Sequence, residues 1–145
     1  MEGKVNSLHI VKWNCHSFYA NLSPFKIFLY SNKPPIVCLC ETWLVENRLP
    51  SFVNYTSFFV CRPQRNGVGL SMLARNDLCV ARKNIDAFPD GHLECQAVSV
   101  SGVHDCVGIL NIYNPLLKSM FYFQQQTSPS IVVGDFNAHH GLRSS

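Results

Sequence analysis

The chain has 145 residues, of which 47% are hydrophobic and 14% are charged, and its formal net charge is +3. Soluble domains carry roughly 25% charged residues, so this composition excludes a disordered or strongly solvated chain. The length predicts a single domain over residues 1–145. The small positive charge permits an anionic partner without requiring one.

The sequence contains no apolar run of the ~18 residues that a membrane-spanning helix needs, and no signal-peptide core follows Met1. We therefore expect an intracellular protein that has no membrane partner. Seven cysteines, an odd number, occur without a CxxC pair. This pattern favours buried free thiols over a disulfide scaffold or a zinc site.

The predicted elements begin with a strand at His9–Trp13. A helix is expected from about Ser23, with Pro24 at its first position, and it ends in the proline-rich segment 32–35. The next strand, Ile36–Cys40, is apolar throughout, which is typical of a strand buried on both faces.

The rest of the chain predicts two strand pairs, a helix and a last strand, so that strands dominate and helices interrupt them. A turn signal at Gln64–Gly67 joins the first of these pairs. The mixture indicates the α/β class. In chain order these elements are Thr56–Arg62 with Val68–Arg75, Glu94–Val100 with Cys106–Tyr113, a short helix at Leu116–Gln126, and a strand at Ile131–Val133.

Polar residues stand at the carboxyl ends of four predicted strands. Taken singly, such a residue is usually a turn or cap residue. If the strands are neighbours in one sheet, however, their polar ends converge at one edge, where α/β proteins place their chemistry. The residues are Asn14, Glu41, Tyr113 with Asn114, and Asp135 with Asn137.

This set of side chains is suited to the hydrolysis of phosphate esters. Carboxylates bind a hard divalent cation such as Mg²⁺ through oxygen, and the cation stabilises charge on the phosphoryl oxygens. A second carboxylate can orient or deprotonate the attacking water. Amide and phenol donors can bind the non-bridging oxygens as charge moves onto them.

Four segments, in this order, resemble the endonuclease/exonuclease/phosphatase superfamily. More narrowly, they resemble the apurinic-type endonuclease domain of non-LTR retrotransposons, and the likeness extends from about His9 to Ser145. The Gly-Asp-Phe-Asn motif is the most specific of them. The segments are Trp13–Cys15, Cys40–Trp43, Asn111–Pro115 and Gly134–His140.

The resemblance implies a role for each matching residue. Glu41 corresponds to the metal-binding glutamate, for Mg²⁺ or Mn²⁺, and Asn14 to the asparagine that supports the metal and phosphate site. Tyr113 corresponds to the tyrosine near the scissile phosphate. Asp135 corresponds to the aspartate that orients the nucleophilic water, and Asn137 to its partner.

The resemblance also implies an architecture and partners. The fold would be the N-terminal part of a two-sheet β-sandwich flanked by helices. The function would be Mg²⁺-dependent nicking of target DNA, in the nucleus, next to a reverse transcriptase domain. Two other interpretations stay open: a catalytically inactive retrotransposon remnant or binding module, and a phosphatase or phospholipase of the same superfamily.

Two departures from the family pattern affect these expectations. Cys40 stands where the family usually has glutamine, and no Ser-Asp-His motif precedes Ser145. We therefore expect a domain without its C-terminal part, with impaired cleavage. Strands such as Ile36–Cys40 would then be covered on one side at most, which predicts self-association through the uncovered sheet. His139 and His140 do not replace the missing motif.

Overall fold

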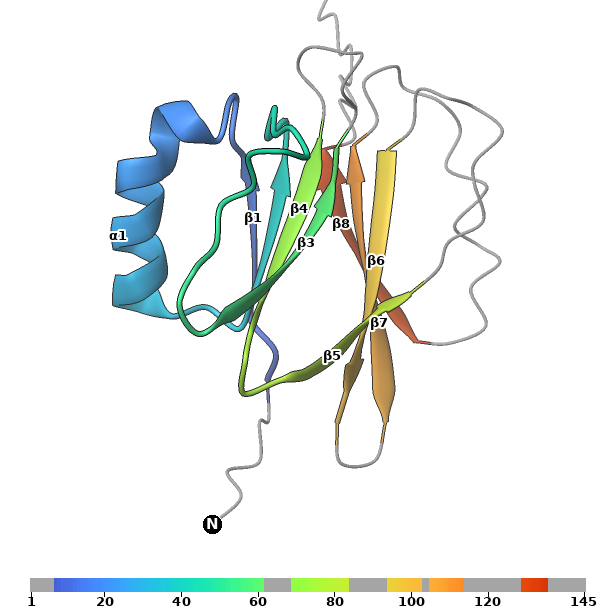
Figure 1. The fold of residues 1–145 in the computed structure, drawn as a ribbon. Helices are drawn as coiled ribbons and strands as arrows, with labels where there is room; N and C mark the ends of the chain where they lie inside the picture. The colour runs from blue at the N-terminus through green and yellow to red at the C-terminus, as the bar shows by residue number, and fades with distance from the viewer. Residues whose placement is uncertain (1–6, 62–68, 84–93, 103–104, 114–128, 136–145) are drawn as a thin grey trace, which may run out of the picture.

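The computed structural model describes residues 7–61, 69–83, 94–102, 105–113 and 129–135. In these ranges two four-stranded sheets pack against each other, and helix α1 (Leu22–Asn32) covers the outer face of one sheet (Figure 1). The predicted α/β class and two-sheet sandwich are thereby confirmed.

The first sheet has the strand order β1-β2-β4-β3. Strands β1 and β2 run parallel because the segment that contains α1 crosses over between them, and the other neighbours are antiparallel. The four strands are β1 (Ile10–Asn14), β2 (Ile36–Cys40), β3 (Tyr55–Val60) and β4 (Leu70–Arg75).

The second sheet has the order β5-β6-β7-β8, in which only β7 and β8 are parallel. Strand β5 was not predicted, because it is short and largely exposed and so lacks an apolar signal. The strands are β5 (Cys79–Lys83), β6 (Glu94–Ser101), β7 (Cys106–Tyr113) and β8 (Ser130–Asp135).

The predicted strands are all present, and β2 and β7 have the expected bounds. The ends of the others differ by one or two residues, the last strand being longer at both ends. The predicted turn at Gln64–Gly67 and the predicted helix at Leu116–Gln126 lie outside the described residues.

Helix α1 starts one residue before the expected Ser23, so Pro24 is its third residue and not its first. A 3₁₀ turn at Tyr19–Asn21 leads into the helix, and proline is tolerated there because N–H groups of the first turn have no helical partner. Lys33 closes the helix with φ 47° and donates its N–H to the Leu29 carbonyl oxygen at 2.9 Å.

In the described ranges, no helix has the length and apolar character needed to cross a membrane.

Strand β2 lies at the centre of the core, and all five of its residues are buried. Val37 and Leu39 pack with α1 and its neighbours. Ile36 and Cys38 pack toward the second sheet. The prediction that this strand is covered on one side at most is therefore wrong, because α1 and the second sheet cover opposite faces.

Strand β8 is less well covered. In the part of the chain that the structure describes, it pairs with β7 alone. Ile131 is 40% exposed and Val132 is 36% exposed. The second sheet thus presents apolar side chains on its outer strand.

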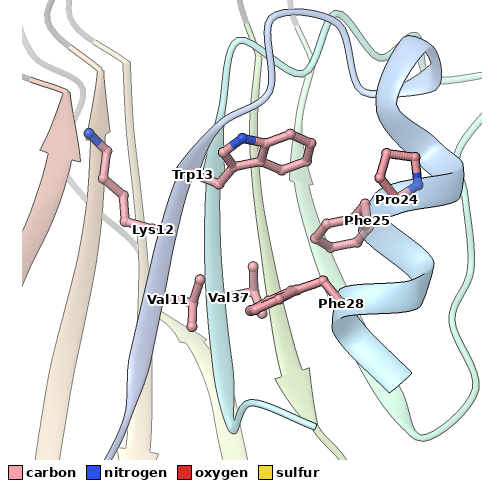
Figure 2. A pocket seen from close by; sticks show the side chains of 7 residues that line it. All are labelled: Val11, Lys12, Trp13, Pro24, Phe25, Phe28 and Val37. Carbon is pink, nitrogen blue, oxygen red and sulfur yellow. The ribbon is translucent and has the colours of Figure 1, made fainter. Parts of the chain in front are cut away.

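An apolar groove of about 300 Å³ lies between α1 and β1 (Figure 2). Val11 and Trp13 point from β1 toward the helix, whereas Lys12 points to the opposite side of the strand. Trp13 stacks on Phe25 with ring centroids 5.6 Å apart. None of the predicted site residues lines this groove.

Candidate active site

The carboxyl ends of β1, β2, β7 and β8 meet at one end of the sandwich. The parallel register places Asn14 beside Cys40, and Tyr113 beside Asp135. The condition that these strands are neighbours in one sheet is not met, since β1 and β2 lie in the first sheet and β7 and β8 in the second. The site is consequently built across the sandwich, because the chain crosses to the second sheet after β4.

Two hydrogen bonds between predicted site residues connect the sheets at this end. The Tyr113 hydroxyl donates to Glu41 Oε1 at 2.6 Å, and Asn14 Nδ2 donates to Asp135 Oδ2 at 3.1 Å. Four of the five predicted site residues are thus brought together in two cross-sheet pairs. Asn137, like Asn114, lies outside the described residues.

Glu41 directly follows β2 and has a left-handed backbone with φ 51°. Its side chain is only 14% exposed, and its Oε2 lies 2.9 Å from His16 Nδ1. Sequence reasoning missed His16. The available signal was its position two residues after Asn14, on the loop that follows β1, but a single histidine carries little information.

Tyr113 is placed to donate a hydrogen bond. Burial, the hydrogen bond to Glu41 and the charges of Glu41 and Asp135 raise the pKa of its phenol above the usual value. The hydroxyl is therefore protonated near neutral pH, as a donor to a carboxylate or to a phosphate oxygen requires.

Cys40 forms part of the apolar base of the site. It is 1% exposed and packs with Leu70 and Tyr113. Burial is the main cause that raises the pKa of its thiol to about 12. At neutral pH this residue therefore supplies a neutral, apolar surface beside Glu41.

Asn111 has a structural role that sequence reasoning did not assign, although the residue lies within a quoted motif. It is buried on β7, and its Nδ2 donates to the carbonyl oxygens of Leu39 and Ser71 at 3.0 and 3.2 Å. Both acceptors belong to the first sheet. The amide therefore fixes the two sheets relative to each other next to the site.

Glu94 is a second buried polar residue near the site, and it too was not predicted. It is 2% exposed and is the register partner of Tyr113. Its Oε2 accepts a hydrogen bond from the Gly69 N–H at 3.0 Å. Gly69 has φ 115°, and a Cβ there would collide with the Thr42 hydroxyl, so this close approach requires glycine.

The available donors suit a divalent cation with few protein ligands. In the described residues, no group of three or more His, Cys, Asp and Glu side chains could hold a metal ion. Glu41 and Asp135 nevertheless supply carboxylate oxygens, and the neighbouring Cys40 thiol is protonated. Mg²⁺ commonly takes one or two carboxylates and keeps several waters, which agrees with a site whose carboxylates are Glu41 and Asp135.

The fold resembles that of solved nucleic-acid-processing enzymes. An AP endonuclease from Archaeoglobus fulgidus is 18% identical with a TM-score of 0.63, over 90% of this chain and 58% of that one. The endonuclease domain of TRAS1, a telomere-specific non-LTR retrotransposon, is 14% identical with a TM-score of 0.63, over 92% of this chain and 60% of that one. TDP2 from D. rerio, complexed with a single-strand DNA product, is 17% identical with a TM-score of 0.62, over 91% of this chain and 61% of that one.

At these identities the likeness concerns the fold, and the chain spans less than two thirds of the length of each structure. A comparison with curated protein sequences finds no match. The sequence profile of the endonuclease/exonuclease/phosphatase family matches residues 13–145, which include both cross-sheet pairs. This chain belongs to the endonuclease/exonuclease/phosphatase family.

Proposed function

We propose that this protein is a metal-dependent hydrolase of the phosphodiester bonds of DNA, with Mg²⁺ as its ion and Mn²⁺ as a substitute. The observation that supports this most is the pair of contacts between the sheets, Tyr113 to Glu41 and Asn14 to Asp135. Together they gather carboxylate, phenol and amide groups at one end of the sandwich. The neighbouring folds belong to enzymes whose names refer to DNA processing.

The residues divide the chemical work between them. Glu41 would hold the metal ion, whose positive charge would stabilise the negative charge that develops on the phosphoryl group. The Tyr113 hydroxyl orients Glu41 and can donate to a phosphate oxygen. Asp135 would orient the attacking water and accept its proton. Asn14 keeps the Asp135 carboxylate in position, and Asn137 would assist at the same water.

We further propose a specific biological setting. The order and spacing of the motifs, and the fold shared with the TRAS1 endonuclease domain, support a target-site nicking endonuclease of a non-LTR retrotransposon. Such an enzyme would act in the nucleus, on chromosomal DNA, beside a reverse transcriptase domain that extends the exposed 3′ hydroxyl.

Plasmid nicking tests the proposal. Conversion of supercoiled to open-circular DNA should be weak and should require Mg²⁺, and Asp135→Asn should lower it further, by up to roughly 10²–10⁴-fold, the usual contribution of a general base. Asp77→Asn is the matched control, because Asp77 pairs with Arg75 on the surface and its replacement should leave the rate unchanged.

Two outcomes would count against this function. Nicking that persists in Asp135→Asn would assign the activity to other groups or to a contaminant. DNA binding without Mg²⁺-dependent nicking would favour the binding-module interpretation over a hydrolase.

A further inference from the structure

Two loops beside the candidate site present aromatic rings to solvent. His16 follows β1 and Trp43 follows β2, and their ring centroids lie 5.7 Å apart with the planes inclined by 44°. The His16 side chain is 80% exposed, and Trp43 is 47% exposed. We call this pair of residues the aromatic rim.

The backbone around the aromatic rim is unusual. Six non-glycine residues in the described ranges have positive φ, and four of them lie on these loops: His16, Ser17, Glu41 and Trp43. Non-glycine residues adopt this conformation only where the surrounding structure enforces it, and they concentrate at ligand-binding and active sites. The local conformation is therefore a sign of function that exposure by itself would not give.

Hydrogen bonds and packing hold Trp43 outward. The Phe18 N–H donates to the Thr42 carbonyl oxygen at 3.0 Å, and the Thr42 N–H donates to the Gly69 carbonyl oxygen at 3.2 Å. Thr42 and Leu44, on either side of Trp43, are 1% and 4% exposed. Because both neighbours are buried, the indole between them faces solvent in a defined position.

The aromatic rim is continuous with the candidate site. His16 Nδ1 lies 2.9 Å from Glu41 Oε2, and the Ser17 N–H donates to the Glu41 carbonyl oxygen at 3.0 Å. A phosphodiester held near Glu41 would thus bring the nucleoside on one side of the phosphate to the two rings.

We propose that the aromatic rim binds an unstacked nucleobase beside the phosphodiester that is cleaved, so that the preferred substrate is single-stranded or locally unpaired DNA. This inference rests on the proposed function, which makes DNA the substrate. In an intact duplex both faces of each base are covered by its neighbours, whereas an unpaired base offers its π-face to an aromatic side chain.

Tryptophan fluorescence can locate the contact, because the chain has only two tryptophans, Trp13 and Trp43. Trp13→Phe leaves Trp43 as the reporter, and Trp43→Phe leaves Trp13, which lies in the groove against Phe25. Titration is done in EDTA, so that no cleavage occurs, with a short mixed-sequence single-stranded oligodeoxynucleotide. It should quench Trp43 strongly and Trp13 little, and the same strand in a duplex should quench Trp43 less.

Binding of the variants, measured by fluorescence anisotropy of a labelled oligonucleotide, separates stacking from positioning. Trp43→Ala should weaken single-strand binding about ten-fold or more, while Trp43→Phe should keep most of the affinity. His16→Phe loses the contact with Glu41 but retains a ring beside Trp43, so it should keep most of the affinity if stacking is what binds the base. Phe28→Ala, which removes a partly exposed ring from the groove, is the matched control and should also bind normally.

The outcomes distinguish the two proposals. Equal affinity of Trp43→Ala and the unmodified protein for the single strand, with both proteins folded by circular dichroism, would overturn the aromatic rim even if plasmid nicking occurs. Equal quenching of Trp13 and Trp43 would overturn it as well. Single-strand binding that depends on Trp43 supports the rim, and if Mg²⁺-dependent nicking is then absent, it is the hydrolase assignment that fails.

Discussion

At the scale of single residues, the candidate site depends on hydrogen bonds between side chains from different sheets. Tyr113 and Glu41 are separated by 72 positions in the sequence, and Asn14 and Asp135 by 121. Each pair can form only after the sandwich has closed. Removing one donor therefore tests a contact that exists only in the closed sandwich.

Tyr113→Phe removes the hydroxyl that donates to Glu41 and retains the ring. We expect Mg²⁺ affinity, measured by titration calorimetry, to fall by roughly 10–100-fold, the usual effect of losing a group that orients a metal ligand. Tyr55→Phe is the control, because its hydroxyl donates to the Pro34 carbonyl oxygen outside the site. Unchanged Mg²⁺ affinity in Tyr113→Phe would contradict the assignment of Glu41.

The cysteines differ in reactivity according to their burial. All seven are free thiols; three are buried, while Cys79 and Cys106 are exposed. Burial raises the pKa of Cys15, Cys38, Cys40 and Cys95 to about 12. The prediction of buried free thiols thus holds for Cys15, Cys38 and Cys40, but not for the exposed Cys79 and Cys106.

This difference predicts a pH dependence of stability. Above pH 9, the ordinary pKa, an unfolded thiol loses its proton, but a thiol with a folded pKa of about 12 keeps it. The free energy of unfolding should therefore fall as pH rises from 9 toward 12, which urea denaturation at a series of pH values can measure.

The same burial predicts the order of alkylation. Iodoacetamide in the native state should modify Cys79 and Cys106 before Cys38. Early modification of Cys38 would contradict its assignment to the core.

At the scale of elements, the pairing of β7 with β8 positions Tyr113 next to Asp135. The two strands approach so closely at Gly134 that a Cβ there would collide with the Ile112 carbonyl oxygen. The glycine in the Gly-Asp-Phe-Asn motif therefore has a physical reason, because only a residue without a side chain allows this register.

Gly134→Ala should force β8 away from β7 and displace Asp135. We expect the free energy of unfolding to fall by about 1–3 kcal/mol, measured by urea denaturation, together with loss of nicking. Gly102→Ala, where the nearest atom is the Asp105 carbonyl oxygen at 3.1 Å, should cost less. Equal stability of Gly134→Ala and the unmodified chain would show that the strands can separate without cost.

At the scale of the whole molecule, the sandwich is closed by apolar packing and by buried amides. Ile36, Met72, Val98 and Ile109 pack between the sheets. Gln96 Nε2 donates from β6 to the Phe58 carbonyl oxygen at 2.8 Å, and Asn111 makes the corresponding link from β7. The described part of the chain therefore has its own core, contrary to the uncovered sheet that the motif comparison suggested.

Self-association stays a prediction, and we now expect it to take place through β8. Ile131 and Val132 are 40% and 36% exposed on an outer strand, and such strands pair readily with other chains. We expect the apparent mass in light-scattering chromatography to rise with protein concentration. Val132→Lys should reduce this rise, whereas the matched change Val53→Lys, at a 71% exposed residue outside the helices and strands, should not. A sharp monomer peak at all concentrations would exclude self-association.

Much of this architecture could be read from local patterns. The apolar run Ile36–Cys40 predicted a strand buried on both faces, and the structure has it. The polar residues at strand ends identified Asn14, Glu41, Tyr113 and Asp135 before their contacts were known. The weak nicking expected of these 145 residues, and their description as one incomplete domain, stay predictions.

The sequence was sufficient for strands and strand-end residues because alternation, apolar runs and turn residues are local properties of the chain. These local patterns were not sufficient to assign each strand to one of the two sheets, to find β5, or to predict the contacts of His16 and Asn111. Those depend on which distant segments pack together, and the same apolar face can be buried against either sheet until the whole core forms. The pairing of Glu41 with Tyr113 and of Asn14 with Asp135 is thus a product of the closed sandwich.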